Sequence, residues 1–499
     1  MEQASVLVVG AGPCGLTAAC ELTRHGAAVR VIDAGPRAAT GTRSLLLWPP
    51  QLAVLADYGV LGEALSLGRR PEAFTYSTDT RRLARFRFTR ETAPLVLPQH
   101  HTDRLLEKAL TAMGVTVERG RRATRVTQTP GEVRVQTTDG SGRPSTLTAA
   151  WLIGADGAHS TVRAALGTPA TRTKALSRFL LAEGALTPAP PVTDIEYTLT
   201  PRGALLIAPL PHGPYRVAGD VTGTAGPTVE EVRALLRRSR RALDIADLTL
   251  LTEFTSEESL VHAMRTGRVF LLGDAAHTHY PVGGQGANLG MQDARNLAWK
   301  LAGVIDRRLR EGVLATYSTE RRAAARQVLR MTGLVARIAL AGPPVSSARD
   351  LLLTAAAGLP AVQDRYTARL AGLKTSYPHT PLGSPAPDRP RRIGRLSDAT
   401  TVGLPCPDWA RAEQPTTTYR LITRGAGRSV LRARADELVR GHPLVTRRHI
   451  DGPDEQCLLV RPDGYTACAA ATARLDDVRR LLDRVSTRTS PPDRKTEDQ

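Results

Sequence analysis

Short apolar runs and glycine-rich turns alternate at the start of the chain. The apolar run Val6–Val9 is typical of a buried strand, and the turn Gly10–Gly15 leads into a helical pattern that ends near Gly26. A second strand, Val29–Asp33, ends in an acidic residue. The order of strand, glycine-rich turn, helix and strand predicts a parallel βαβ unit and therefore an α/β, Rossmann-like domain.

Between about residues 172 and 266 the apolar period changes to two. Apolar and polar positions alternate over Ile195–Leu199, Ala204–Pro209 and Tyr215–Asp220, which predicts an antiparallel sheet inserted into the first domain. Such a sheet can form one wall of a pocket for an apolar substrate. The long helix that follows carries an apolar stripe, which predicts core packing, at Met291, Ala294, Leu297, Ala298, Leu301, Val304 and Ile305.

Further helices and strands are predicted outside these regions. Leu105–Met113 and Leu475–Val485 have helical patterns, and Tyr419–Ile422 and Gln456–Val460 read as strands flanking a helix near Ser429–Arg440. Together these patterns divide the chain into a first domain at 1–171 and 267–376 with a substrate-side excursion near 71–98, the inserted sheet at 172–266, a proline-rich linker at 377–395, a small α/β domain at 396–485 and a disordered tail at 486–499.

Composition narrows the class of protein. The 499 residues exceed a single-core domain, and an apolar content of 41% can fill two or three domains. The formal charge of +19 comes from dispersed arginines in a chain with 4% aromatic residues, which disfavours nucleic acid as a partner. We find no long apolar span and no signal peptide in the sequence, and the five cysteines show no CxxC spacing. We therefore expect a cytoplasmic, metal-free protein without a membrane partner.

The first glycine-rich turn has the spacing of a dinucleotide fingerprint. Gly10 would make the tight turn, Gly12 would let a pyrophosphate approach the backbone beside Pro13, and Gly15 would allow close packing of helix on strand. Asp33 would accept a hydrogen bond from the adenosine ribose. This motif alone does not separate FAD from NAD.

A glycine-rich segment further along the chain, the third motif in chain order, favours FAD. Gly273 and Asp274 follow an apolar strand, and Pro281 and a run of glycines lead to a helix start at Gly286. A helix start presents unpaired backbone N–H groups to negative charge. We therefore expect Asp274 to bind the ribityl hydroxyls of a flavin, and the amides of Gly286 to Leu289 to stabilise the reduced ring.

The second motif in chain order, Asp156-Gly157, follows the apolar strand Trp151–Gly154 and precedes a helix start capped by Ser160. The three motifs, in this order and at these separations, resemble those of the single-component FAD-dependent aromatic hydroxylases with the p-hydroxybenzoate hydroxylase fold. The resemblance covers essentially the whole chain. Within that family, the chain is most similar to the actinobacterial polyketide hydroxylases acting on angucyclines and anthracyclines, and to the rifampicin monooxygenases.

The resemblance implies further features of the site. Asp156 and Gly157 would serve both FAD and NAD(P)H, and the C-terminal domain would be thioredoxin-like but, lacking CxxC, without redox chemistry. Arg43 would lie near the flavin, although the following Pro49-Pro50-Gln51-Leu52 departs from the family pattern. The expected cofactor-binding residues are Gly10, Gly12, Pro13, Gly15, Asp33, Arg43, Gln99, Ala123, Asp156, Gly157, Asp274, Pro281, Gly286, Ala287, Asn288 and Leu289.

The resemblance also implies a mechanism in which the flavin carries the chemistry. NADPH or NADH reduces non-covalently bound FAD, O2 adds to give a C4a-hydroperoxide, and one oxygen atom is transferred to a hydrophobic polycyclic aromatic substrate. No catalytic nucleophile is assigned. His212, Tyr197 and Tyr215 are candidates for deprotonating the substrate, and His277 and His279 need no metal to explain them.

Several alternatives stay open at the level of sequence. Baeyer–Villiger oxygenation of a polyketide ketone, inactivation of an antibiotic and flavin reduction without oxygen transfer would all use the same motifs. A protein that has lost its flavin is the non-enzymatic alternative. The substrate, the position oxygenated, the preferred nicotinamide cofactor and the choice between monomer and homodimer are not fixed by the sequence.

Overall fold

The computed structural model describes residues 4–38, 44–172, 177–190, 193–200, 203–221, 226–339, 345–377, 403, 405–406, 417–425, 430–452, 456–470 and 475–487. These residues form two compact units. Unit 1 draws on Met1–Cys20, Val29–Ala294 and Ala325–Lys374, and unit 2 on Glu21–Ala28, Arg295–Ala324 and Thr375–Gln499. No described helix is long and apolar enough to cross a membrane.

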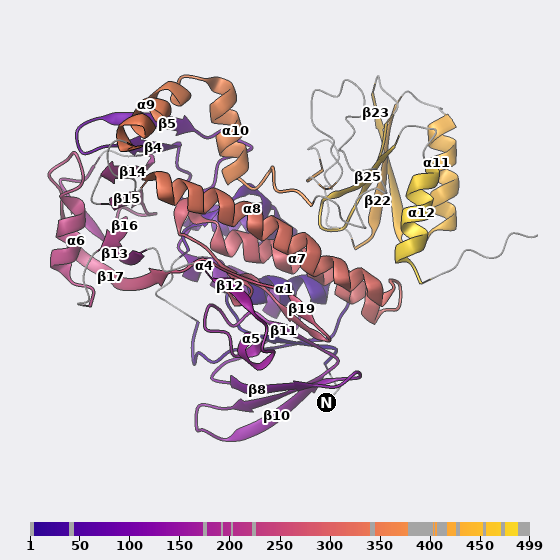
Figure 1. Cartoon of the computed structure of the whole chain (residues 1–499). Helices are drawn as coiled ribbons and strands as arrows, with labels where there is room; N and C mark the ends of the chain where they lie inside the picture. Colours follow the sequence, from indigo (N-terminus) through magenta and orange to yellow (C-terminus); the bar gives the residue numbers. More distant parts are fainter. Residues whose placement is uncertain are drawn as a thin grey trace, which may run out of the picture. The chain divides into compact units, whose positions relative to one another are not determined.

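A six-stranded sheet is the first main element of unit 1 (Figure 1). Its strands in spatial order are β19 (Arg265–Thr266), β20 (Val269–Leu271), β11 (Trp151–Gly154), β1 (Val6–Val9), β2 (Val29–Ile32) and β7 (Val117–Glu118). Every neighbouring pair is parallel except β19 with β20. The apolar run of β1 is wholly buried, as expected for a covered parallel sheet. With α1 (Pro13–Arg24) after β1, the predicted βαβ unit is confirmed.

A seven-stranded sheet is the second main element of unit 1. Its strands in spatial order are β17 (Asp244–Ser256), β13 (Ser177–Thr187), β16 (Tyr215–Val221), β15 (Gly203–Pro209), β14 (Ile195–Thr200), β4 (Ala73–Ser77) and β5 (Arg82–Arg87). The three strands predicted from alternation are confirmed. The strands within residues 172–266 pair antiparallel as expected, and the sheet is mixed only because β14 also pairs with β4 in parallel. Since β4 and β5 come from the excursion near 71–98, the long chain between β4 and β14 supplies the crossover that a parallel pair needs.

Helices cover the seven-stranded sheet at both ends (Figure 1). α6 (Val229–Leu236) packs on β13, β16 and β17, where Val232, Leu235 and Leu236 join an apolar core. α9 (Val345–Ala357) and α10 (Pro360–Leu370) pack on β5. Aromatic side chains of β4 and β5 fill the space beneath them.

Shorter elements connect the two sheets. They are α2 (Pro49–Asp57), α3 (Leu61–Leu67), α4 (Gln99–Ala112), α5 (Thr161–Ala165), the two-stranded sheet of β3 (Leu46–Leu47) and β6 (Leu95–Val96), the three-stranded sheet of β8 (Arg122–Gln128), β9 (Val133–Thr138) and β10 (Pro144–Ala149), and that of β12 (Ala170–Arg172), β18 (Ser259–Val261) and β21 (His277–Thr278). The helix α4 begins six residues before the predicted start at Leu105, directly after Pro98. The helical pattern did not reveal this first turn because it contains two histidines and a threonine, which have modest helix propensity.

Two long helices, α7 (Gly286–Ile305) and α8 (Ala315–Ala339), contribute residues to both units. The predicted stripe of α7 is buried from Met291 to Leu301, and half-buried at Val304 and Ile305. The core prediction for this helix is therefore confirmed over most of its length.

Unit 2 contains a four-stranded sheet in the order β23 (Val445–Asp451), β22 (Tyr419–Gly425), β24 (Gln456–Val460) and β25 (Thr466–Ala470). α11 (Val430–Gly441) and α12 (Leu475–Val485) confirm the two predicted helices. The strands β23 and β25 were not predicted, since β23 is a half-exposed edge strand rich in polar residues. The prolines of the expected linker, from Pro378 on, lie outside the described residues.

The disordered tail was expected to begin at residue 486, which is too early, because residues 486 and 487 make contacts with the rest of unit 2. Ser486 is buried, pairs with Leu309 as an isolated bridge and accepts a hydrogen bond from Arg310 Nε at 2.5 Å. Thr487 N–H donates to the carbonyl of Arg308. Residues 488–499 lie outside the described residues.

The interior of unit 2 contains a network of buried charges. Glu320 accepts from Lys300 Nζ at 2.8 Å, from Asn296 Nδ2 at 2.7 Å and from both terminal nitrogens of Arg461 at 2.9 Å. Arg461 Nε also donates to Asp463 Oδ1 at 2.9 Å. Burial alone would raise the pKa of Glu320, but the cations Arg461 and Lys300 outweigh burial and lower the pKa to about 2.

Candidate functional site

The three glycine-containing motifs meet at one cavity in unit 1, with a volume of about 1170 Å³. The first motif contributes Gly12 and Pro13 to the wall, the second contributes Gly157, and the third contributes Asp274. The other predicted site residues that line this cavity are Gln99, Pro281, Gly286 and Ala287. Segments distant in sequence therefore converge where the motifs predict a ligand.

The glycines of the first motif have two distinct roles. Gly10 has φ +105°, and a Cβ there would lie 2.3 Å from the carbonyl oxygen of Ala155. A Cβ on Gly15 would lie 1.9 Å from the carbonyl oxygen of Gly10. Both glycines are thus required by the protein's own packing. Gly12 differs, because a Cβ there would meet nothing within 4 Å, yet Gly12 lines the cavity.

The carboxylate of Asp156 is used within the protein. It accepts from the Ser160 hydroxyl at 2.5 Å and from the Val162 N–H at 3.1 Å, while Ser160 caps α5 through the Arg163 N–H. This arrangement confirms the predicted cap and leaves Gly157, at φ +81°, as the cavity-facing residue of the pair. Asp156 is not among the residues lining the cavity.

Arg163 joins the second and third motifs and was not singled out from the sequence. Its guanidinium donates to the carbonyl oxygens of Ala158 at 2.6 Å, Ala275 at 3.1 Å and Asp274 at 3.4 Å. A lone arginine after a capped turn gave no signal of this role. The three bonds fix the backbone beside Asp274 against the Asp-Gly turn.

The predicted adenosine-side residues lie away from the cavity wall. Asp33 accepts from the N–H groups of Ala11 at 2.7 Å and Gly35 at 2.8 Å, so its carboxylate holds the first turn in place. Ala123 is buried in β8. Neither residue lines the cavity, and their contacts with an adenosine stay predictions. Arg43 lies outside the described residues.

The third motif forms two tight turns before α7. Gly283 and Gly284 have φ of +69° and +61°, which favours glycine, and α7 then begins at Gly286. A Cβ on Gly286 would meet only His279 Nε2, at 3.6 Å, which is ordinary contact. The protein itself therefore leaves room for a side chain at Gly286, beside N–H groups of the first helical turn that have no acceptor within the helix.

The side chain of Asn288 and the N–H of Leu289 make hydrogen bonds within the protein. The Asn288 side chain accepts from Trp48 N–H at 2.9 Å and donates to the carbonyls of Leu46 and Gly284 at 2.7 Å, so it ties the motif to the chain before α2. The Leu289 N–H donates to the carbonyl of Gln285 at 2.9 Å and is already used. Neither residue lines the cavity, so the wall at this helix start is formed by Gly286 and Ala287.

The segment Pro49-Pro50-Gln51, which departs from the family pattern, has a structural role. Pro49 begins α2, a position that suits proline because its missing N–H would be unpaired there. Trp48 Nε1 donates to the carbonyl of Gly283 at 3.0 Å, and Gln51 Nε2 donates to that of Asn288 at 2.8 Å. These residues buttress the third motif, a role that the sequence did not reveal.

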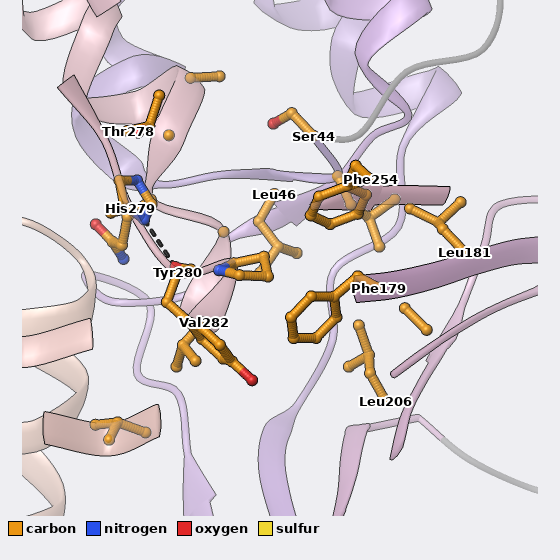
Figure 2. Close-up of a pocket in the computed structure, with 18 of the residues that line it drawn as sticks. Ser44, Leu46, Phe179, Leu181, Leu206, Phe254, Thr278, His279, Tyr280 and Val282 are labelled. Carbon is orange, nitrogen blue, oxygen red and sulfur yellow. Dashed lines mark hydrogen bonds between the residues drawn. The ribbon is translucent and has the colours of Figure 1, made fainter. Parts of the chain in front are cut away.

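The two histidines of the third motif have separate environments. His277 Nε2 lies 2.7 Å from Asp293 Oδ2, and both side chains are buried. His279 Nδ1 donates to the carbonyl of Tyr280 at 2.8 Å, and its buried Nε2 has no hydrogen-bond partner among the described residues (Figure 2). Burial lowers the pKa of His279, so the ring is neutral. No group of three or more potential metal ligands occurs in the described part of the chain.

The other half of the cavity is apolar and aromatic. Figure 2 shows Phe179 and Leu181 of β13, Leu206 of β15 and Phe254 of β17 opposite the segment His279–Val282. The rings of Phe179 and Phe254 stack at 5.5 Å, and Phe179 meets the edge of Tyr280 at 5.1 Å. This wall can take a large, flat, apolar molecule.

A second aromatic group lines the cavity beneath α10. Tyr197 stacks on Tyr76 at 5.3 Å, and the hydroxyl of Tyr76 is hydrogen-bonded to that of Tyr366. Burial raises the pKa of all three phenols, that of Tyr366 to about 12. The phenols are therefore neutral near pH 7.

These environments narrow the candidates for a substrate-deprotonating residue. Tyr197 lines the cavity, but its raised pKa makes it a poor base at neutral pH. Tyr215 donates to the carbonyl of Pro190 at 2.8 Å, and His212 occupies a turn with φ +63°. Neither Tyr215 nor His212 lines the cavity.

Arg216 is a charged group of the cavity that the sequence analysis missed. It is 2% exposed, and burial lowers its pKa although its Nε donates to Glu183 Oε1 at 2.8 Å, an interaction that counteracts part of the lowering. Its Nη1 reaches the carbonyl of Ser44 at 3.4 Å. Position 216 reads as one member of an alternating strand, so only the folded sheet reveals that it faces the cavity.

Comparison with known proteins agrees with this geometry. The family model described as an FAD binding domain matches residues 3–332. The chain is 32% identical to 6-methylpretetramide 4-monooxygenase of Streptomyces rimosus over 93% of this chain and 90% of that protein. It is 35% identical to rifampicin monooxygenase of Rhodococcus hoagii over 68% and 72% of the two chains. The solved structure of anhydrotetracycline hydroxylase from Streptomyces rimosus superposes with a TM-score of 0.76 at 27% identity, covering 98% of this chain and 100% of that one.

Proposed function

This chain belongs to the FAD-binding aromatic monooxygenases, and we propose that it uses NAD(P)H and O2 to hydroxylate a polycyclic aromatic substrate of the polyketide type. The observation that carries this proposal is the continuity of one cavity, which runs from Gly12 and Asp274 to the aromatic wall of the seven-stranded sheet. Flavin and substrate would therefore occupy adjoining parts of the same space.

The residues of the cavity fit FAD at several points. Gly12 leaves open space beside the start of α1, where the pyrophosphate would lie. Asp274 would accept from the ribityl hydroxyls, and the amides of Gly286 and Ala287 would meet the pyrimidine edge of the ring. Gln99, held by the Ser44 N–H at 3.2 Å, would contact the cofactor from the side of α4.

We propose that the FAD is bound without a covalent bond. Cys14 lines the cavity and is half-buried, but its thiol packs against Gly273 and Gly290, where a Cβ would lie within 2.6 Å of the sulfur, and burial raises its pKa. A protonated thiol is a poor nucleophile. Acid precipitation should release yellow flavin into the supernatant, and flavin retained in the pellet would contradict the proposal.

When bound, FAD would supply the redox chemistry by which electrons from NAD(P)H activate O2, so that one oxygen atom of O2 enters the substrate and the other leaves as water. The protein's residues position the reactants and control the local charge. The helix start at Gly286 provides positive potential next to the ring. Phe179, Phe254 and Tyr280 exclude water from the space between ring and substrate. Arg216, paired with Glu183, places a buried cation where it would stabilise a phenolate oxygen of the substrate.

The test is isotope incorporation. The holoprotein is supplied with NADPH, ¹⁸O2 and a panel of tetracyclic phenols, and the masses of the products are measured by mass spectrometry. We expect one labelled oxygen atom in the product and substrate-stimulated NADPH oxidation. Substrate converted without label, or NADPH consumed with peroxide as the only product, would contradict hydroxylation.

A matched pair of variants locates the reaction. Phe179→Arg fills the apolar wall and should abolish product while FAD stays bound. Thr249→Arg, exposed on β17 of the same sheet and outside the cavity lining, should behave as wild type. Equal activity in the two variants would place the substrate elsewhere.

We also propose that the sheet of unit 2 is a thioredoxin-like fold without redox activity. Its strand order β23-β22-β24-β25, with β23 and β22 parallel and helices α11 and α12, supports this proposal. The thiols of Cys406, Cys457 and Cys468 are buried, and burial raises the pKa of Cys457. Cys457→Ser should leave hydroxylation unchanged, and a loss of turnover with the fold intact would indicate thiol chemistry. The boundaries 377–395 and 396–485 stay predictions.

A further inference from the structure

The outer face of α9 is apolar although it faces solvent. Val345, Leu351, Leu352 and Leu359, the last just after the helix, are 54%, 70%, 68% and 55% exposed. The opposite face, including Ser346, is buried against the protein. A surface helix normally presents polar residues to water, so a continuous exposed apolar stripe marks an interaction surface.

This stripe is part of a larger cluster. Of the nine large apolar residues exposed in the described chain, seven lie between residues 334 and 362. We call these seven the apolar patch: Leu334, Ile338, Val345, Leu351, Leu352, Leu359 and Val362. Hydrogen bonds hold its three helices together, since Arg349 of α9 donates to the carbonyl of Ala339 at 3.0 Å and Gln363 of α10 to that of Ala357 at 2.6 Å.

The apolar patch borders the cavity. Ile338 and Val362 line the cavity and are also 39% and 37% exposed, so the apolar surface continues from the wall to the outside. On the inner side of α9, Leu353 and Ala356 line the same cavity. α9 therefore has the cavity on one side and the exposed stripe on the other.

Arginines surround the apolar patch. Arg326, Arg330 and Arg337 are exposed on the face of α8 that also carries Leu334 and Ile338, at helical spacing. Arg365 and Arg369 are exposed on α10.

Few acids balance these cations. Within α9, α10 and the unit 1 part of α8, Asp364 is the one exposed acid among the described residues, and Asp350 is paired with Arg349 at 2.7 Å. Glu258, which is buried, faces Arg337. The rim of the apolar patch is therefore basic.

We propose that the apolar patch docks on the surface of an anionic lipid bilayer, so that lipophilic substrates pass from the membrane into the cavity. The leucines would enter the boundary of the acyl chains, and the arginines would meet lipid phosphates. A second copy of this chain fits less well, because the basic rims would face each other. The docking is peripheral, and it revises the expectation that the protein has no membrane partner. The identity of the cargo rests on the proposed function.

Vesicle co-sedimentation tests the proposal with the full-length holoprotein. Vesicles of equal parts phosphatidylglycerol and phosphatidylcholine should bind the wild type at least about tenfold more tightly than phosphatidylcholine alone, and salt at about 1 M should remove the difference because it shortens the Debye length to about 3 Å. The double variant Leu351→Glu/Leu352→Glu should lose binding at least about tenfold. Val430→Glu, at a residue also 68% exposed but on α11, should bind as wild type.

Three results would overturn the proposal. They are failure of the wild type to bind anionic vesicles, equal binding by the double variant, or a wild-type dimer that the double variant dissociates in sedimentation velocity, which would assign the patch to a second copy. Leu351 and Leu352 do not line the cavity, so turnover of a dissolved substrate without vesicles should be unchanged in the double variant. Vesicle binding requires no turnover, so its failure and that of the proposed function are distinguishable.

Discussion

Two buried carboxyl groups, one in each unit, have opposite properties. Glu320 in unit 2 is fully buried among Lys300 and Arg461, which hold its pKa at about 2. Asp103 in unit 1 is 3% exposed, and the contact from Gln99 Nε2 at 3.3 Å does not offset burial, which raises its pKa to about 7. Asp103 Oδ1 has no hydrogen-bond partner among the described residues.

The difference shows how the two interiors are used. In unit 2 the charges of the Glu320 network satisfy one another, so this network serves the fold. In unit 1, next to the cavity, polar atoms such as His279 Nε2 lack partners in the described chain, and Gly12 and Gly286 leave space that no side chain fills. Buried polar groups are normally paired, so these features point to a ligand.

The largest expected effect is on stability. Glu320→Gln removes the anion between Lys300 and Arg461, and an uncompensated buried charge costs about 3–5 kcal/mol. We expect the free energy of unfolding of unit 2 to fall by that amount in urea titrations. Asp477→Asn disrupts the exposed pair with Arg480 and should cost about 1 kcal/mol or less. Equal losses in the two variants would show that the buried network does not stabilise unit 2.

Acid titration follows from the same shift. The pKa of Glu320 is about 2 in the folded protein and 4.5 in the unfolded reference state. Between these two pH values, Glu320 is therefore more protonated in the unfolded chain than in the folded protein. The stability contributed by Glu320 is present above about pH 4.5 and is lost as the pH falls towards 2. In Glu320→Gln, the urea midpoint of unfolding should change less with pH over this range than it does in the wild type. A variant with the wild-type slope would remove Glu320 as the titrating group.

Asp274 should affect the cofactor more than the fold. Asp274→Ala removes charge-assisted hydrogen bonds to the ribityl chain, worth about 1.5–3 kcal/mol, and should weaken FAD binding about 10- to 100-fold. Fluorescence titration of refolded apoprotein measures this, with thermal unfolding of the apoprotein as the control. Unchanged affinity would exclude Asp274 from the site.

Asp103 should give a pH dependence of the opposite sign to that of Glu320. Its pKa is raised from 3.8 to about 7, so the folded protein binds the extra proton and stability falls as the pH rises from about 4 to 7. Asp103→Asn should remove this fall and raise the melting temperature at pH 8 relative to wild type, with little change at pH 4. A variant that melts lower at both values would show that the ionised carboxylate has a partner.

The sequence predicted the local features of the site and missed those that depend on tertiary contacts. Gly12, Gly157 and Asp274 belong to turns whose spacing carries their role, so the motifs located them. Arg163, Trp48 and Arg216 act on segments more than 100 residues away, and no local pattern distinguishes them from ordinary surface or core residues. The apolar face of α9 was also missed, because helical periodicity does not reveal which face is covered.

The central claim is that the open space at Gly12 belongs to FAD, and one titration tests it most directly. Gly12→Ala adds a Cβ that meets no protein atom within 4 Å, so the melting temperature of the apoprotein should be unchanged. FAD affinity should fall at least about tenfold, since the methyl group enters the space of the pyrophosphate. Gly15→Ala, whose Cβ would lie 1.9 Å from a backbone oxygen, should destabilise the apoprotein itself. Wild-type FAD affinity in Gly12→Ala would contradict the account.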